Sequence, residues 1–473
     1  MELDRDICYR ALLTRDKRFD GRMFTAVKST GVYCRPICPA RPPKLENCLF
    51  FASAAAAQGA GFRPCLRCRP EVSPRLAAAH GTSNTVTRAL QLIETGAAND
   101  HDLESLAGRL GVGDRHLRRL FQEHVGISPK SVLQTRRVLF AKQLITDTTM
   151  PLTDVALASG FASLRTFNHS MRLLYGRPPS EFRRARRTPE KPSNICLLLP
   201  YSPPYDWASM LTFLTARSIP GVERVENGHY RRTIRLGGKN GSIWVGPARD
   251  ALAVSIQFPD VRALPEIVRR VTAMFDLGAH PGSIAAHLQA DPMLADSVLQ
   301  RPGLRVPGAW DGFEMAVRAI LGQQISVSAA TKLAGKLVTA LGRPIDESRF
   351  TFPDPATVAA SDLEFIGMPE ARKRTIRGLA QAFVDNPSFF DPALTLEATV
   401  ERLCAVPGIG EWTAHYIAMR ALRQPDAFPA KDAGILRAFS NRGLTLSTKE
   451  LIKRSEAWRP WRAYAVLHLW SSL

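Results

Sequence analysis

Four cysteines in two short-spaced pairs constrain the first part of this chain more than any other feature. Three residues separate Cys34 from Cys38, and two separate Cys65 from Cys68. Two such pairs joined by a connecting segment are the usual layout of a four-thiolate zinc site. The alternative is two chance pairs of buried thiols, but stretches rich in Arg and Pro are poor places to bury thiols. The sequence therefore predicts a small zinc-binding domain, which we place at residues 1–78.

The other cysteines and the absence of a long apolar run indicate the cellular compartment in which we expect the protein. Cys8, Cys48, Cys196 and Cys404 are scattered singly, and we expect them to pack as small apolar side chains. No apolar run approaches the roughly 20 residues that span a bilayer, and the N-terminus is charged throughout. We therefore expect a cytoplasmic protein with reduced thiols and no membrane partner.

The charge balance indicates a polyanionic partner. The 473 residues carry 63 Lys and Arg against 43 Asp and Glu, a net charge of +20. An excess of this size is typical of proteins that bind nucleic acid, and less often of those that bind a membrane surface. Five arginines also surround the cysteine pairs, and such a collar could hold a phosphate next to a nucleophilic thiolate; they are Arg35, Arg41, Arg63, Arg67 and Arg69.

Helical periodicity begins near residue 84 and predicts two helix-turn-helix units. The first lies within residues 103–129, the second within 151–175, and one helix over 130–146 joins them. We place this all-α domain at residues 79–187. Its candidate DNA-reading side chains, of types that can read base edges, are Arg115, His116, Arg118, Arg119, Arg165 and Asn168. The alternative is a solvated, salt-bridged face, which is disfavoured because acidic partners four residues away are scarce.

A basic, proline-containing stretch over residues 183–194 is typical of a linker, which we place at 188–199. Alternating apolar and polar residues over 195–275 then predict strands, and we place a strand-rich subdomain at 200–281. Residues 282–473 have helical patterns throughout. The expected fold class is therefore multidomain α+β.

One turn in the helical part is rich in information. Pro407, Gly408 and Gly410 lie in the segment "VPGIGEWTAHY", where glycines let the backbone approach a phosphate. This is the pattern of a helix-hairpin-helix, which grips DNA without reading its sequence. The short pattern alone would also fit an ordinary helix connection. Asp432 follows about twenty residues later, in "DAFPAKDAGILRAF".

Three resemblances to known families extend these predictions. The segments "TGVYCRPIC" and "GFRPCLRC" resemble the N-terminal domain of the Ada methyltransferase family, which takes methyl groups from methyl phosphotriesters in DNA. The resemblance implies that Cys34 is the methyl acceptor and that Cys38, Cys65 and Cys68 complete the zinc site. The two helix-turn-helix units, with the trailing "GRPPSEFRR", are similar to the DNA-binding domain of AraC-type regulators.

The C-terminal part resembles the HhH-GPD superfamily of base-excision glycosylases. The segments "PPYDWASMLTFLTARSIPGVE", "WDGFEMAVRAILGQQISV" and "WRPWRAYAVLHLW" are similar in order and spacing to the AlkA family of 3-methyladenine DNA glycosylases. The resemblance implies that Asp432 is catalytic and that Gln324 fills the stack vacated by the flipped base, where AlkA carries a bulky apolar residue. It also implies that Trp412, Tyr416 and Trp470 line the base pocket. Trp412 occupies the position at which bifunctional relatives carry a lysine, so strand cleavage is not expected.

The resulting hypothesis is an adaptive-response protein with two repair activities. A self-methylating methyl phosphotriester repair domain and transcription activator would be fused to a monofunctional DNA-3-methyladenine glycosylase, acting as a monomer on double-stranded DNA and on RNA polymerase. Two alternatives remain open. The C-terminal half could only bind DNA in a transcription regulator, or the zinc site could respond to oxidants instead of alkylators.

Overall fold

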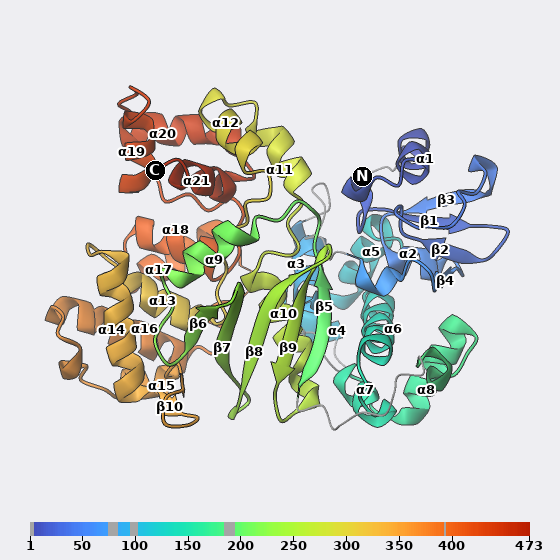
Figure 1. Ribbon diagram of the computed structural model, residues 1–473, viewed down its shortest axis with the longest axis horizontal. Coiled ribbons are helices and arrows are strands. Elements are labelled where there is room, and N and C mark those ends of the chain that lie inside the picture. The colour runs from blue at the N-terminus through green and yellow to red at the C-terminus, as the bar shows by residue number, and fades with distance from the viewer. Residues whose placement is uncertain (1–3, 74–83, 95–102, 184–193, 392–393) are drawn as a thin grey trace. The chain divides into compact units, whose positions relative to one another are not determined.

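The computed structural model describes residues 4–73, 84–94, 103–183, 194–391 and 394–473, and these form two compact units (Figure 1). The first unit extends to Ser202 and also includes Ala248–Arg269 and Leu277–Ala279; the second holds Pro203–Pro247, Arg270–Asp276 and His280–Leu473. The expected boundary after residue 78 and linker residues 188–193 lie outside the described residues.

The zinc domain is built on a small four-stranded sheet with the order β3-β1-β2-β4. Antiparallel pairing joins β1 to β2 and β3, whereas β2 and β4 run parallel, with Val32 opposite Arg63 and Tyr33 opposite Pro64. This parallel register brings the ends of β2 and β4 together, so that the two cysteine pairs meet at one end of the sheet. The elements are α1 (Arg5–Leu13), β1 (Phe24–Val27), β2 (Val32–Cys34), β3 (Cys48–Phe51), α2 (Ala54–Gly59) and β4 (Arg63–Pro64).

The predicted helix-turn-helix units are both present. Leu117 and Phe121 are buried on one face of the second helix of the first unit, and Phe167 and Met171 on that of the second. The helices are α3 (Asn84–Glu94), α4 (Leu103–Arg109), α5 (Asp114–His124), α6 (Pro129–Asp147), α7 (Leu152–Ala158) and α8 (Leu164–Tyr175). The long helix α6 begins at Ser128, whose side chain accepts from Ser131 N, with Pro129 in the first turn.

The strand-rich region begins at Ile195, where the alternation begins, and earlier than the boundary that we placed at residue 200. We expected a linker over 188–199, but Ile195–Pro200 forms β5 and pairs antiparallel with β9 (Ala251–Gln257). The reason is a period-two pattern in which Leu197 and Leu199 are buried. A second antiparallel set joins β6 (Glu223–Glu226), β7 (His229–Leu236) and β8 (Lys239–Ala248). Two helices, α9 (Trp207–Thr215) and α10 (Leu264–Met274), also fall in the region predicted as strand-rich.

The C-terminal region is helical as predicted, apart from a short ribbon of β10 (Arg343–Pro344) and β11 (Phe350–Thr351). Its core packs Leu337, Ile376, Leu403 and Ile417 with their apolar neighbours. The helices are α11 (Pro281–Leu288), α12 (Pro292–Gln300), α13 (Gly312–Leu321), α14 (Val327–Leu341), α15 (Pro355–Ala359), α16 (Glu370–Asp385), α17 (Leu396–Cys404), α18 (Glu411–Arg420), α19 (Ala433–Ser440), α20 (Thr448–Ser455) and α21 (Arg462–Trp470). None of the described helices is long and apolar enough to cross a membrane.

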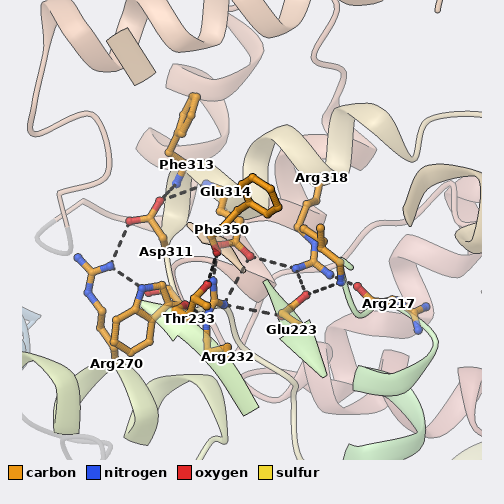
Figure 2. A network of polar contacts seen from close by, with 12 residues as sticks. Arg217, Glu223, Arg232, Thr233, Arg270, Asp311, Phe313, Glu314, Arg318 and Phe350 are labelled. Atoms are coloured by element: carbon orange, nitrogen blue, oxygen red, sulfur yellow. Dashed lines mark hydrogen bonds and ion pairs between the residues drawn. The ribbon is translucent and has the colours of Figure 1, made fainter. Parts of the chain in front are cut away.

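A buried network of charges fixes α13 against β6 and β7 (Figure 2). Arg232 pairs with Glu314 at 2.7 Å, and Arg318 pairs with Glu223 at 2.9 Å and with Glu314 at 3.0 Å. Burial raises the pKa of Glu223, but Arg318 and Arg232 outweigh it and lower that pKa below its ordinary value. Helix α13 ends at Leu321, so the network anchors the helix from which the loop with Gln324 begins.

Candidate functional sites

The four predicted cysteine ligands form one cluster. The Sγ atoms of Cys34, Cys38, Cys65 and Cys68 all lie within 4.8 Å of one another, which confirms the predicted four-cysteine site. Cys38, Cys65 and Cys68 are buried, whereas Cys34 is only partly buried. Of the four residues, Cys34 is therefore the least buried.

The chemistry of this cluster fits zinc. Four thiolates at the spacing of two pairs are the donor set that tetrahedral Zn²⁺ prefers. The backbone N–H of Arg35 donates to Cys68 Sγ at 3.3 Å, as expected of an outer contact that stabilises a thiolate ligand. A donor bond of this kind also makes the Cys68 sulfur less nucleophilic.

The arginine collar expected around the cysteines is only partly available. Arg35 is buried, donates to Asp20 Oδ1 at 2.8 Å, and reaches the Cys68 carbonyl at 3.1 Å. Arg69 is committed to Glu71 and Asp147. The guanidinium groups of these two arginines are already bound to carboxylates, so they support the fold and do not hold a phosphate. The exposed members of the collar are Arg41, Arg63 and Arg67.

The residues predicted to read DNA lie on the second helix of each helix-turn-helix unit. On α5, Arg115, His116, Arg118 and Arg119 are exposed; on α8, Arg165 is exposed and Asn168 half-buried. Two of these side chains already have partners. Arg118 pairs with Asp114 four residues earlier at 2.8 Å, and Arg119 contacts His116 Nδ1 at 3.1 Å. The acidic partner that the sequence argument considered scarce is therefore present for Arg118.

The predicted hairpin is a tight turn between α17 and α18. Gly408 has φ of +92°, and a Cβ atom there would lie 2.0 Å from Thr375 Oγ1, so glycine is required. Pro407, Gly408 and Gly410 are exposed, and the intervening Ile409 is buried and anchors the turn. The exposed glycines place the backbone of this turn at the surface, where a phosphate could approach it.

The loop after α13 is joined to this turn. Gln323 Nε2 donates to Gly408 O at 3.1 Å and to Thr413 Oγ1 at 3.1 Å. Gln324 next to it is exposed, with φ of +59°. Gln323 and the exposed Ile325 were not identified from the sequence, although both lie in the quoted "GQQISV" segment.

Asp432 lies at the centre of the candidate base-excision site. It is the N-cap of α19, and its Oδ1 accepts from Ile435 N at 3.0 Å. Trp470 Nε1 donates to the same oxygen at 2.8 Å, and Trp412 Nε1 donates to Oδ2 at 2.9 Å. Three N–H donors therefore fix the orientation of this carboxylate. Asp426, six residues earlier in the chain, is instead paired with Arg459 and Arg462.

The three predicted pocket aromatics come together beside Asp432. The rings of Trp412 and Tyr416 stack at 5.4 Å between centroids and 7° between planes. Trp470 lies 6.3 Å from Tyr416 at 52°. Each of the three residues is partly exposed, so core packing does not cover them completely.

Two arginines that contact Tyr416 or Phe213 were not identified from the sequence. Arg420 Nη1 donates to Tyr416 Oη at 2.7 Å, and its guanidinium lies 4.6 Å from the Phe213 ring centroid. Arg217 lies 3.7 Å from the same centroid. The spacing of four residues between Tyr416 and Arg420 on a helix was the signal that could have revealed the contact.

These contacts also change proton affinities. Burial first, then repulsion by Arg217 and Arg318, lowers the pKa of Arg420 to about 10, so it is protonated at neutral pH. Burial raises the pKa of the Tyr416 phenol, but Arg420 and Arg217 outweigh it and the pKa lies below its ordinary value.

Four family models match the chain in succession. They are the metal binding domain of Ada (residues 7–71), a helix-turn-helix domain (106–185), the AlkA N-terminal domain (196–311) and the HhH-GPD superfamily of base excision DNA repair proteins (317–463). The predicted fold class is confirmed. Because the helix-turn-helix and HhH-GPD domains are DNA-binding domains, DNA is the partner of this protein.

Relatives match both the whole chain and its parts. A probable bifunctional transcriptional activator/DNA repair enzyme AlkA of Mycobacterium tuberculosis is 40% identical over 482 residues, covering 100% of this chain and 97% of that protein. DNA-3-methyladenine glycosylase 2 of Escherichia coli is 34% identical over 284 residues, covering 58% of this chain and 95% of that protein. The chain belongs to the family of bifunctional transcriptional activator/DNA repair enzymes of the AlkA type.

Part of the bifunctional transcriptional activator/DNA repair enzyme Ada of Escherichia coli is also similar, with 39% identity over 129 residues, which covers 27% of this chain and 35% of Ada. Among solved structures, a 3-methyladenine DNA glycosylase from Archaeoglobus fulgidus superposes with a TM-score of 0.52 at 23% identity, covering 58% of this chain and 96% of that one. This likeness shows that the C-terminal region has the glycosylase fold.

Proposed function

We propose that this chain repairs alkylated DNA in two ways and reports the damage to the transcription machinery. The zinc domain transfers the methyl group of a methyl phosphotriester to Cys34, and the helix-turn-helix domain activates transcription through RNA polymerase. The glycosylase domain releases N3-methyladenine and N7-methylguanine from double-stranded DNA. The protein acts as a cytoplasmic monomer, with domain boundaries near residues 78 and 187 and the glycosylase part starting at Ile195.

The geometry of Asp432 carries the glycosylase proposal. The carboxylate is 8% exposed and held by two indole N–H groups and one backbone N–H. Held in this way, it stabilises the positive charge that develops on the deoxyribose as the base departs, and it orients the attacking water. Gln324 fills the vacated stack, and the turn at Pro407, Gly408 and Gly410 grips the backbone beside the flipped nucleotide.

The partial exposure of Cys34 supports its role as methyl acceptor. A zinc ion bound by the four sulfurs would keep them deprotonated at neutral pH. Cys34 Sγ then attacks the methyl carbon, the S–C bond forms, and the C–O bond breaks with its electron pair remaining on the phosphate oxygen. The exposed Arg63 and Arg67 lie close in sequence to the cluster and bind the phosphodiester that leaves. The thioether has no simple exit, so each molecule reacts once.

Base release from methylated duplex DNA by the full-length protein tests the glycosylase assignment. Asp432→Asn removes the negative charge and should slow single-turnover release roughly 100-fold or more, because stabilisation of the developing cation is lost. Binding of the duplex should persist. Asp426→Asn is the matched control: it disturbs the Arg459 and Arg462 pairs but should leave the chemistry intact.

If the wild-type protein binds DNA but releases no base, the C-terminal half only binds DNA and the protein is a transcription regulator. If Asp432→Asn releases bases at a near wild-type rate, the activity is present but the catalytic residue is assigned wrongly.

A further inference from the structure

Arg420 is a buried cation without an anionic partner. Its side chain is 5% exposed, and no carboxylate of the described residues pairs with it. It donates instead to neutral oxygens: the carbonyls of Pro307 and Gly308 and the hydroxyl of Tyr416. A buried charge of this kind is costly, so its retention calls for a role that a neutral side chain could not fulfil.

The surroundings of Arg420 increase the local positive potential. Arg217 lies over the same Phe213 ring, at 3.7 Å, and also has no carboxylate partner among the described residues. Arg318 is nearby as well, but Glu223 and Glu314 compensate its charge. Two guanidinium groups without a carboxylate partner among the described residues therefore lie over the Phe213 ring, and that of Arg420 also donates to the hydroxyl of Tyr416, one of the three candidate pocket aromatics.

A positive potential at this place disfavours the binding of a base that is itself a cation. An N3- or N7-methylated purine carries positive charge and leaves as a neutral base, so a fixed cation nearby weakens its binding. A neutral purine leaves as an anion, because the C1′–N9 bond breaks with its electron pair on N9. Water supplies the oxygen that joins C1′, and the departing base gains a proton from solvent. A fixed cation stabilises that anion as it forms.

We propose that Arg420 is a specificity-determining residue that extends excision to neutral purines by stabilising the anionic leaving base. Arg217, which also lies over the Phe213 ring, adds to the same positive potential. The proposal rests on the proposed pocket at Asp432, Trp412 and Tyr416. At a separation of several ångströms and an effective dielectric near 20, one charge of this kind changes the relative rates of the two substrate classes by about tenfold or more.

Single-turnover excision from one duplex sequence tests the proposal, with N7-methylguanine as the cationic base and hypoxanthine as the neutral one. Arg420→Met should lower the ratio of hypoxanthine to N7-methylguanine excision by about tenfold or more. Arg420→Lys, which keeps the charge, should hold the ratio within about twofold of wild type. Arg402→Met is the matched control, because Arg402 is also bound to two backbone carbonyls, those of Ser388 and Phe389, and lies over the Phe389 ring.

An equal loss on both substrates in a folded Arg420→Met protein would make Arg420 a purely structural anchor and overturn the proposal, as would an unchanged ratio. Should that variant fail to fold, Arg217→Met must lower the ratio in the same direction, and an unchanged ratio there overturns the proposal too. Asp432→Asn distinguishes a wrong assignment of the pocket from a wrong assignment of Arg420. If it remains active on both substrates, the pocket itself is assigned wrongly, whatever Arg420 does.

Discussion

At the scale of the residue, Asp432 combines the capping of a helix with the catalytic role that we propose for it. The same Oδ1 caps α19 and accepts from Trp470, while Oδ2 accepts from Trp412. The approach is so close that a Cβ atom on Gly434 would lie 3.0 Å from Asp432 Oδ1 and 3.1 Å from Trp470 Cδ1. The orientation of the carboxylate is therefore determined by covalent geometry and hydrogen bonds together, before any substrate arrives.

The Trp470 bond gives a prediction about rate. Trp470→Phe retains an aromatic ring but removes the N–H donor, so Asp432 is held less firmly and excision should slow by at least about tenfold. A hydrogen bond to a charged group contributes about 1.5–3 kcal/mol, which sets this scale. Single-turnover kinetics on methylated duplex DNA measure it. Trp458→Phe is the control, since Trp458 donates to Asp291 at 2.7 Å outside the site, and only stability should fall.

Trp412 supports a second prediction, about the type of chemistry. Because an indole replaces the lysine of bifunctional relatives, no Schiff base should form, and borohydride should trap no covalent complex with DNA. The neighbouring Lys431 is exposed and is the candidate amine if trapping does occur. Trapping that disappears in Lys431→Met would show that this protein cleaves strands through a different residue.

At the scale of the element, the sequence predicted the structure best where apolar residues recur at helical spacing over many residues. The six helices of the helix-turn-helix region and the helical C-terminal region agree with their apolar spacing. The strand Ile195–Pro200 follows the alternation, but the boundary placed at residue 200 assigned it to the linker, because local composition does not reveal pairing with β9. Arg420 and Gln323 could not be identified either, because their partners come from contacts that tertiary packing alone creates.

One ion cluster joins the zinc domain to the long helix α6. Arg69 binds Glu71 at 3.1 Å and Asp147 at 2.7 Å, and Lys142 binds Glu71 at 3.1 Å. The side chains of Glu71 and Lys142 are only 2% and 4% exposed. Burial lowers the pKa of Lys142 despite the attraction of Glu71. The zinc domain and α6 are therefore tied by charges that are shielded from solvent.

Lys142→Met should destabilise the first unit by about 3 kcal/mol, because it leaves Glu71 buried with one cation fewer. Denaturant titration of the full-length protein, with zinc release to a metallochromic dye as the signal, measures this unit. Lys17→Met is the matched control, because the Lys17–Asp250 pair is exposed, at 54% and 52%, and its loss should cost less than about 1 kcal/mol. Equal effects of the two substitutions would mean that the cluster does not join the domains.

At the scale of the whole molecule, the proposed function requires two different modes of DNA recognition. In that proposal the exposed arginines of α5 and α8 contact base edges, whereas the exposed turn at 407–410 contacts the phosphate backbone without reading the sequence. Both modes include phosphate contacts, so both should weaken with salt. The two chemistries use separate residues, and each half can therefore be inactivated without the other: Cys34→Ala should retain base excision, and Asp432→Asn should retain methyl transfer.

The last prediction connects the reaction at Cys34 to transcription. Methylation removes one negative charge from the cysteine cluster, which lowers repulsion of the DNA backbone by about 1 kcal/mol at an effective dielectric near 20. Operator affinity should then rise several-fold. Incubation with methylated DNA, followed by peptide mass spectrometry, should show one gain of about 14 daltons, the mass of CH₂, on the peptide that holds Cys34, while gel-shift titration at fixed salt measures affinity before and after. Methyl on Cys38, Cys65 or Cys68 would contradict the residue assignment. Methylation of Cys34 without tighter binding would leave the repair reaction and remove the switch, because the charge change would then have no effect on the helix-turn-helix domain.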